Sequence, residues 1–167
     1  SQWFVKTEGM GAKALKAVED GDIEIIPKRF DKIWNNWLTD IHDWCISRQL
    51  WWGHQIPIWY DEEGNEYCAM SEAEAVKKAN GKLLKRDPDV LDTWFSSWLW
   101  PISVFDGICK PKNLEFKYYY PTQDLVTGPD IIFFWVIRMI ISGYEFTGRE
   151  PFKNIYFTGL VLSLIHI

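Results

Sequence analysis

The sequence is short of positive charge, with 18 Lys and Arg against 23 Asp and Glu in 167 residues and a formal net charge of −5. This composition lacks the basic surface that binds a nucleic-acid backbone directly. Cysteine is also scarce: Cys45, Cys68 and Cys109 form no CxxC pair, which argues against a disulfide scaffold or a zinc knuckle and fits a reducing cytoplasm. The longest apolar run, residues 131–141, is too short to cross a bilayer and contains Arg138. No secretory signal is recognisable, so we expect a cytoplasmic chain without membrane contact.

Several catalytic signatures are missing as well. The sequence has no Gly-Lys-Ser phosphate loop, no Gly-x-Ser-x-Gly turn and no His-Glu-x-x-His pair. Aromatic residues, in contrast, are abundant: 11 are Trp, and 47% of the chain is hydrophobic. This apolar content predicts a folded domain rather than a disordered segment. Tryptophan has a large flat ring with one N–H donor, so this number of them indicates a large core or a ligand pocket.

The first two thirds of the chain contain a series of short elements. Apolar periodicity and turn residues predict helices over 11–20, 30–44 and 71–80, and strands over 23–26 and 50–60. The second helix has a stripe at i, i+3 and i+4 spacing, formed by Phe30, Ile33, Trp34, Trp37, Leu38, Ile41 and Trp44. We interpret this stripe as a core-facing surface.

A polar segment over residues 61–86 follows the predicted strand at 50–60, in which Gly53 and Pro57 indicate an irregular or edge strand. It begins with a hairpin turn and contains Ser71-x-x-Glu74, which has the pattern of a capping box. We expect it to be a small, peripheral helical insertion.

The last third of the chain predicts a βαβ unit. A strand over 124–127 is followed by Gly128-Pro129-Asp130, a nearly all-apolar helix that ends at Ser142-Gly143, and a strand over 154–158. This order implies parallel pairing and an α/β fold. Ligands of such sheets bind at the carboxyl ends of the strands, where Gly128, Asp130 and the Thr158-Gly159 pair are expected.

The turn at Gly128 and Asp130 is a candidate nucleotide site. A glycine at this point lets a ligand approach the backbone, and an aspartate can accept hydrogen bonds from ribose hydroxyls. The alternative is that Asp130 only caps the helix that follows.

Two tryptophan-containing strings are further candidates, residues 51–54 (WWGH) and 93–95 (TWF). Two Trp rings can form a slot for an apolar side chain, with Gly53 leaving room for a ligand; the alternative is core packing. Asp89 and Asp92, three residues apart, are either paired carboxylates for acid–base work or helix-capping residues.

Together these strings resemble one family. Residues 43–57 (DWCISRQLWWGHQIP) resemble the block that follows the editing insertion of valyl-tRNA synthetases, and 89–97 (DVLDTWFSS) resemble the next block. The later strings YPT, LVTG, DIIFFW and TGLV follow in the order of the family, so the resemblance covers Gln2 to Val161. Isoleucyl enzymes tend to have Tyr-Trp-Gly in place of the Trp-Trp-Gly at 51–53, which favours valine.

The resemblance implies a Rossmann-type parallel sheet, of which residues 1–161 would be the second half of a class I catalytic domain. By motif match, Trp52 and Trp94 would line the valine side-chain pocket, and Gly128 and Asp130 would hold the ribose of ATP and of valyl-adenylate. The implied substrates are valine, ATP with Mg²⁺, and tRNA(Val), in a monomeric full-length protein.

The sequence departs from the family in several respects. The His-Ile-Gly-His and Lys-Met-Ser-Lys-Ser signatures do not occur, so we expect no catalytic residue in this chain and no activity of the chain alone. Some relatives have a Cys-rich zinc module between the two Trp blocks, but Cys68 stands alone there, so no zinc is expected. Residues 162–167 (LSLIHI) match the translation of a sequencing-adapter end, and we expect them to be an artefact. The alternatives are a Trp-rich carbohydrate- or ligand-binding module and a degenerate nucleotide-binding relic.

Overall fold

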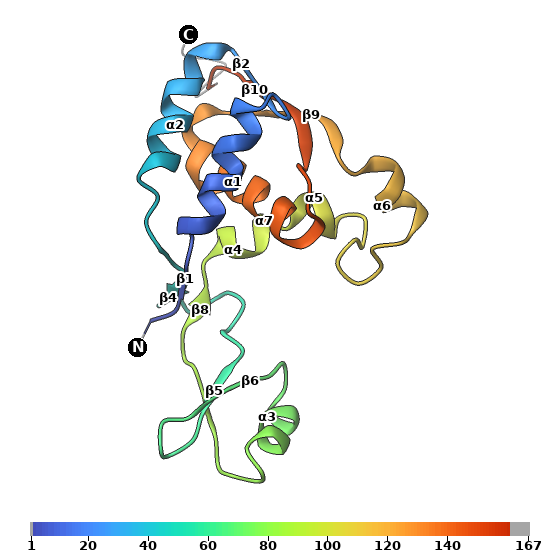
Figure 1. Cartoon of the computed structure of the whole chain (residues 1–167). Coiled ribbons are helices and arrows are strands. Elements are labelled where there is room, and N and C mark those ends of the chain that lie inside the picture. The colour runs from blue at the N-terminus through green and yellow to red at the C-terminus, as the bar shows by residue number, and fades with distance from the viewer. Residues whose placement is uncertain (1, 161–167) are drawn as a thin grey trace, which may run out of the picture. The chain divides into compact units, whose positions relative to one another are not determined.

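The structure is a computed structural model that describes residues 2–160 (Figure 1). Residue 1 and residues 161–167, which include the six-residue tail expected to be an artefact, lie outside the described residues. The chain divides into two compact units, which are described separately: residues 2–4 with 45–93, and residues 5–44 with 94–160. It passes between them within the short strands β1 (Phe4–Val5) and β3 (Trp44–Cys45), and again where α4 (Thr93–Ser97) begins.

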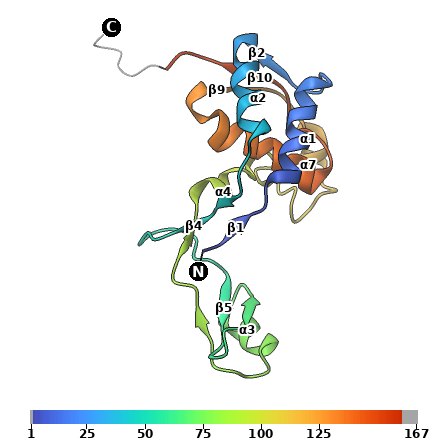
Figure 2. The same ribbon diagram turned by 60° about the vertical axis from the view of Figure 1, so that its left-hand side comes forward.

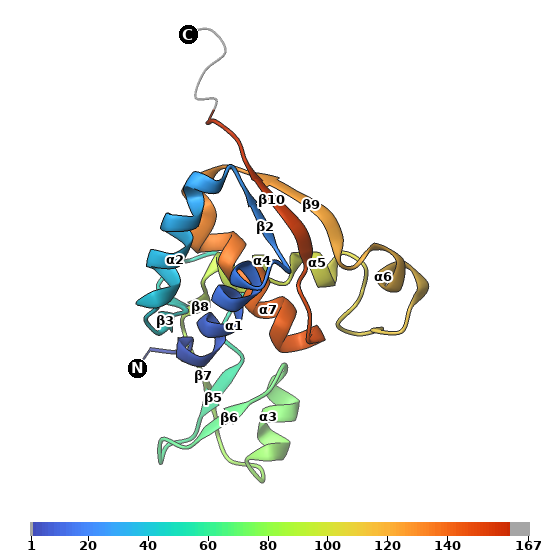
Figure 3. The ribbon, with the colours of Figure 1, turned by 45° about the horizontal axis from the view of Figure 1, so that its top comes forward.

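The larger unit contains a parallel sheet of three strands, in the order β2 (Glu24–Ile26), β10 (Phe152–Phe157) and β9 (Thr122–Thr127) (Figure 3). In the central strand Ile155 pairs with Ile25 on one side and with Leu125 on the other, and all three side chains are buried. The mixed α/β class and the parallel pairing of the predicted βαβ unit are therefore confirmed.

The crossover between β9 and β10 differs from the single helix predicted to end at 142–143. It consists of a 3₁₀ turn η2 (Pro129–Ile131), a π-helical segment η3 (Ile132–Ile137) and α7 (Arg138–Thr147). The helix continues past Gly143 and ends at Gly148, which has a left-handed φ of +76°. Gly143 has a packing role instead, because a Cβ there would lie 2.9 Å from the Tyr120 hydroxyl.

Helices α1 (Glu8–Glu19) and α2 (Asp31–Thr39) complete the larger unit together with three short helices, η1 (Lys28–Phe30), α5 (Trp100–Ser103) and α6 (Leu114–Tyr119). Helix α1 packs against both α2 and α7 (Figure 2). The helix predicted over 30–44 is too long, since α2 ends at Thr39 and Trp44 belongs to strand β3. Trp44 is buried all the same, so its place in the apolar pattern reflects a different element rather than the same helix.

The smaller unit is built from short antiparallel strands. The first pair is β4 (Ser47–Arg48) with β8 (Val90–Leu91). The second sheet has β5 (Ile58–Tyr60) between β6 (Glu66–Cys68) and β7 (Lys85–Arg86), with helix α3 (Glu72–Lys78) after β6. The polar segment 61–86 thus contributes two strands as well as the predicted helix. Only residues 58–60 of the strand predicted over 50–60 form a strand, because no strand within residues 2–160 pairs with residues 50–53.

Two local features of the smaller unit follow the sequence closely. The Ser71 hydroxyl accepts a hydrogen bond from the Glu74 amide at 3.3 Å, as expected for the start of α3. The hairpin turn is organised by Asp61, whose buried carboxylate accepts hydrogen bonds from the Asn65 side chain and the Lys82 ammonium, at 2.8 and 2.9 Å. These two donors hold the pKa of Asp61 well below its usual range.

Within residues 2–160, none of the helices has the length and apolar character needed to cross a bilayer.

Candidate ligand-binding site

The carboxyl ends of β9 and β10 lie side by side in the larger unit. Thr127 pairs with Phe157, and the Thr158 amide donates a hydrogen bond to the Thr127 carbonyl at 3.0 Å. The segments that begin at Gly128 and at Thr158 therefore leave the sheet from adjacent strands at the same edge. This is the placement expected from the sequence, and it is the edge at which parallel α/β sheets bind ligands.

Gly128 has to be a glycine because of Asp130. The backbone at Gly128 is extended (φ −79°, ψ 150°), so no unusual dihedral angle requires a glycine. However, a Cβ at this position would run into the Asp130 carboxylate and would lie 2.9 Å from a methyl group of Leu160. The Asp130 carboxylate thus folds back over the Gly128 backbone and places an acceptor directly at the end of β9.

Asp130 does not cap the following helix. The N-cap residue of η2 is Gly128, and neither η2 nor η3 begins with a side-chain capping hydrogen bond. The Asp130 side chain is exposed and has no hydrogen bond or ion pair to any other residue of the range 2–160. The capping interpretation is therefore wrong, and no donor from the described part of the chain takes up the carboxylate oxygens, which can accept hydrogen bonds from a ligand.

Trp94 borders an apolar pocket close to this turn. The pocket has a volume of about 330 Å³ and is lined by Trp94, Ser97, Trp100, Ile131 and Trp135. Ile131 directly follows Asp130 in the sequence, so the larger unit brings Trp94 and the turn at 128–131 to one place. The Trp135 indole donates a hydrogen bond to the Ser97 carbonyl at 3.0 Å, which fixes one wall of the pocket. Its size and lining suit a small aliphatic side chain.

The sequence did not indicate Trp100 and Trp135 as pocket residues. Their rings lie 5.6 Å apart, centroid to centroid, although they are distant in the chain. Trp135 lies in the apolar run 131–141, which periodicity alone assigns to a buried helix. Its position five residues after Asp130, just over one helical turn away, is the feature of the sequence that could have indicated Trp135 as a pocket residue.

Trp52 belongs to the smaller unit, where its surroundings differ from those of Trp94. Its side chain is 92% exposed and that of Trp51 is fully exposed, so core packing is excluded for both within that unit. Gly53 does not leave room for a ligand, because the space a Cβ would take is bounded by the Val90 side chain at 3.0 Å. The structure does not bring Trp52 and Trp94 together within one unit, and their joint role stays a prediction.

Asp89 and Asp92 do not form a carboxylate pair. Asp92 is buried and forms an ion pair with Arg48 at 2.6 Å, whereas Asp89 accepts a hydrogen bond from Gln49 at 2.8 Å. Asp92 immediately precedes α4, but Asp89 precedes strand β8, so helix capping is wrong for Asp89. Each carboxylate has its own structural partner, and the arrangement is not one for general acid–base catalysis.

Comparison with known proteins identifies the family. The family model described as "tRNA synthetases class I (I, L, M and V)" matches residues 1–164. The chain belongs to the class I tRNA synthetases. This membership agrees with the parallel sheet and the site at its carboxyl edge, and it decides against a carbohydrate-binding module. The order of the matched strings is thus a family property rather than a coincidence of aromatic composition.

Three similar class I tRNA synthetases illustrate the degree of likeness, and each is named valine–tRNA ligase. The protein of Bacteroides fragilis is 54% identical over 96% of this chain, and that of Christiangramia forsetii is 52% identical over 96%. The protein of Chlorobaculum tepidum is 51% identical over 98%. The chain covers only 18–20% of these relatives, so it spans about a fifth of their length.

A solved class I structure shares the fold. It is the agnB2 LeuRS of Agrobacterium radiobacter K84, solved as a ternary complex with tRNA and LeuAMS. The TM-score is 0.58 at 18% sequence identity, and the match covers 75% of this chain and 21% of that one. At this identity the likeness supports the fold alone.

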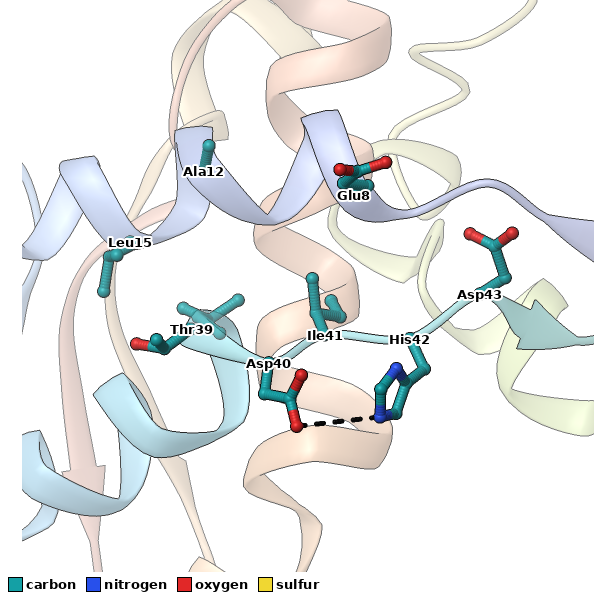
Figure 4. Close-up of a pocket in the computed structure, with 9 residues that line it drawn as sticks. Glu8, Ala12, Leu15, Thr39, Asp40, Ile41, His42 and Asp43 are labelled. Carbon is teal, nitrogen blue, oxygen red and sulfur yellow. Dashed lines mark ion pairs between the residues drawn. The ribbon is translucent and has the colours of Figure 1, made fainter.

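A larger pocket of the same unit lies away from the candidate site (Figure 4). It has a volume of about 690 Å³ and lies between α1 and the segment that follows α2. Figure 4 shows the carboxylates of Glu8 and Asp43 at one end, and the His42 ring directed toward Asp40, with 3.7 Å between Nε2 and Oδ2. Asp43 already accepts a hydrogen bond from the Thr7 amide at 3.1 Å, which holds the start of α1. The acidic walls would repel a phosphate, so this pocket does not suit a nucleotide.

Proposed function

We propose that the protein to which this chain belongs is a valine–tRNA ligase. Such an enzyme activates valine with ATP to valyl-adenylate and pyrophosphate, and then transfers the valyl group to the 3′ end of tRNA(Val). The observation that carries this proposal is the 54% identity over 96% of the chain to a protein named valine–tRNA ligase. Residues 1–161 would form the second half of the catalytic domain, with residues 61–86 as a peripheral insertion.

The candidate site has the groups that binding of an adenylate needs from this half of the domain. Asp130 would accept hydrogen bonds from the ribose hydroxyls of ATP and of valyl-adenylate, and Gly128 would let the nucleotide approach the backbone. The free carboxylate at the end of β9 supports this role. Trp94 would form a wall of the valine side-chain pocket, and Trp52 would contribute from the smaller unit.

The proposed reaction is mainly a matter of positioning. In the first step a valine carboxylate oxygen attacks the α-phosphorus of ATP, and the bond to pyrophosphate breaks. In the second, a terminal hydroxyl of the tRNA attacks the valyl carbonyl carbon and AMP leaves. The residues of this chain hold the ribose at one side and the aliphatic side chain at the other, so the reacting carboxylate is fixed between them.

The apolar pocket sets a limit on selectivity. One methylene group changes binding in such a pocket by about 1–3 kcal/mol, so isoleucine would have to be excluded by shape. Threonine has nearly the shape of valine and is rejected poorly by an apolar pocket, which is why a separate editing site is expected in the full-length protein. The exclusion of isoleucine and the poor rejection of threonine would both depend largely on the walls around Trp94.

Metal chemistry is not assigned to this chain. Residues 2–160 contain no group of three or more His, Cys, Asp and Glu side chains that could hold a metal ion. The Mg²⁺ that the family resemblance implies would therefore be held with ATP by other parts of the protein, and we expect no zinc. We further propose that the full-length protein is monomeric and cytoplasmic.

The test is valine-dependent exchange of pyrophosphate into ATP by the full-length protein, followed by charging of tRNA(Val). We expect exchange with valine, weak exchange with threonine and very little with isoleucine or leucine. The 167-residue chain is assayed in parallel and should show no exchange with any amino acid. Preference for another amino acid would refute the assignment to valine, and no exchange at all would refute it in favour of a degenerate nucleotide-binding relic. Activity of the short chain would refute the view that essential groups lie outside it.

A further inference from the structure

A buried arginine lies behind the pocket that Trp94 borders. Arg138 is the first residue of α7, and only 6% of its surface is exposed. Taking a charged side chain out of water is unfavourable, so a position of this kind requires compensating contacts. In the sequence, Arg138 interrupts the apolar run 131–141, and Arg138-Met139 is one of the strings that resemble the family, but neither observation gives Arg138 a role.

The Arg138 guanidinium is surrounded by aromatic rings. Its central carbon lies 3.6 Å from the centroid of Trp44, 5.1 Å from that of Phe133 and 5.8 Å from that of Phe134. A cation over the face of an aromatic ring is attracted by the ring quadrupole, and the attraction is stronger where water is excluded. Arg138 therefore fixes the positions of these three rings relative to one another.

These rings lead directly to Trp94. Phe134 stacks on Trp94 with 6.1 Å between centroids and an interplanar angle of 28°. On the other side Trp44 makes an edge contact, at 5.7 Å, with Phe95, the residue after Trp94. Arg138 thus contacts one ring that supports Trp94 itself and a second ring that supports its neighbour in the chain.

The backbone of this region strengthens the connection. Residues 132–137 form a π-helical segment, a conformation that is rare and often found at functional sites. The Arg138 amide donates to the Trp135 carbonyl, and its side-chain Nη1 reaches the Phe134 carbonyl at 3.4 Å. One residue therefore holds both the rings and the backbone of the segment that supplies Trp135 to the pocket.

We propose that Arg138 is a positioning residue that fixes the aromatic wall of the amino-acid pocket through Phe134 and Trp94. This inference rests on the proposed function, because it assigns the pocket at Trp94 to the valine side chain. It predicts that loss of the guanidinium loosens the wall without affecting the nucleotide end of the site, since no hydrogen bond or ion pair joins Asp130 to Arg138. Binding of valine and discrimination against isoleucine should change together, while binding of ATP should not.

The experiment uses the full-length protein with Arg138→Met, Arg138→Lys and, as a control, Met139→Leu, a volume-conserving change at the next buried position of the same helix. KM and kcat are measured by pyrophosphate exchange for valine, isoleucine and ATP. We expect Arg138→Met to raise KM for valine about tenfold, equal to about 1.4 kcal/mol, and to reduce the preference for valine over isoleucine. Arg138→Lys should raise KM for valine less than Arg138→Met does, because an ammonium is attracted to one ring but cannot extend over three. Met139→Leu should match the wild type.

Each result has a defined meaning. If the wild type shows no valine-dependent exchange, the proposed function fails. If the wild type is active and both Arg138 variants keep KM for valine within about twofold, the positioning role fails. A loss of active protein with unchanged KM values would show a purely structural role and would also overturn the inference. If Arg138→Met does not fold, Arg138→Lys decides the question by its KM for valine relative to that for ATP.

Discussion

Replacing Gly128 with alanine should damage nucleotide binding through Asp130. The added Cβ would run into the Asp130 carboxylate and would lie 2.9 Å from a Leu160 methyl group. Carbon atoms pack at about 3.5–4.0 Å, so the Leu160 methyl would have to shift by more than about half an ångström, and the carboxylate would have to leave its place. A hydrogen bond to a charged group contributes about 1.5–3 kcal/mol, so its loss should raise KM for ATP about 10- to 150-fold.

Gly159→Ala is the matched control for this change. Gly159 follows the neighbouring strand at the same sheet edge, but among residues 2–160 no neighbouring atom lies within 4 Å of a Cβ built there. The two variants of the full-length protein are compared by pyrophosphate exchange, with ATP and valine varied separately. We expect Gly128→Ala to raise KM for ATP with little change for valine, and Gly159→Ala to behave as the wild type. Equal KM values for ATP in both variants would refute the claim that Asp130 must lie over Gly128.

Three other changes have defined outcomes in the full-length protein. Trp94→Ala removes one of the four apolar walls of the pocket and should raise KM for valine about 15-fold, because such a wall covers roughly two CH₂ groups of the ligand and burial of each contributes about 0.8 kcal/mol. An unchanged KM would contradict the pocket assignment. Burial raises the pKa of Tyr120 to about 12, so this residue should lower the free energy of unfolding as the pH rises from 10 toward 12 and have no effect below pH 10. Urea unfolding of Tyr120→Phe should show a smaller decrease over this range. An identical pH profile for the two proteins would contradict the role of Tyr120. Asp92→Asn removes the charge that pairs with Arg48 and should destabilise the smaller unit by about 1–2 kcal/mol. Native-state proteolysis within residues 45–93 should then be faster than in the wild type. An unchanged rate of proteolysis would contradict this prediction.

The parallel core and its ligand edge could be predicted from the sequence because their signals are local. Glycine and proline at 128–129 mark the end of one strand, and the long apolar run after them fits only a buried crossover helix. Parallel pairing follows from this order, and it places Gly128 and Gly159 at one edge. The residues alone do not distinguish capping from ligand binding for Asp130, because both uses require the same residue at the same position.

The errors came from features that depend on distant contacts. The i, i+3, i+4 pattern continued to Trp44, although the burial of this ring is due to contacts with Phe95 and Trp98 rather than to helix α2. Aromatic residues at 51–52 favoured a strand, but strand propensity has effect only where a partner strand is available. The sequence gives Arg138 no role because its closest ring, that of Trp44, comes from a distant part of the chain.

The π-helical segment also affects how this region can vary in length. A π-helix contains one more residue per hydrogen-bonded turn than an α-helix, so a chain that loses one residue between 132 and 137 can still form a continuous helix. Each residue of an α-helix advances the side-chain direction by about 100°, so such a deletion would turn the rings at 133–135 away from their present partners. Single-residue insertions and deletions at this point would therefore alter which side chains face the pocket while the sheet on either side keeps its register.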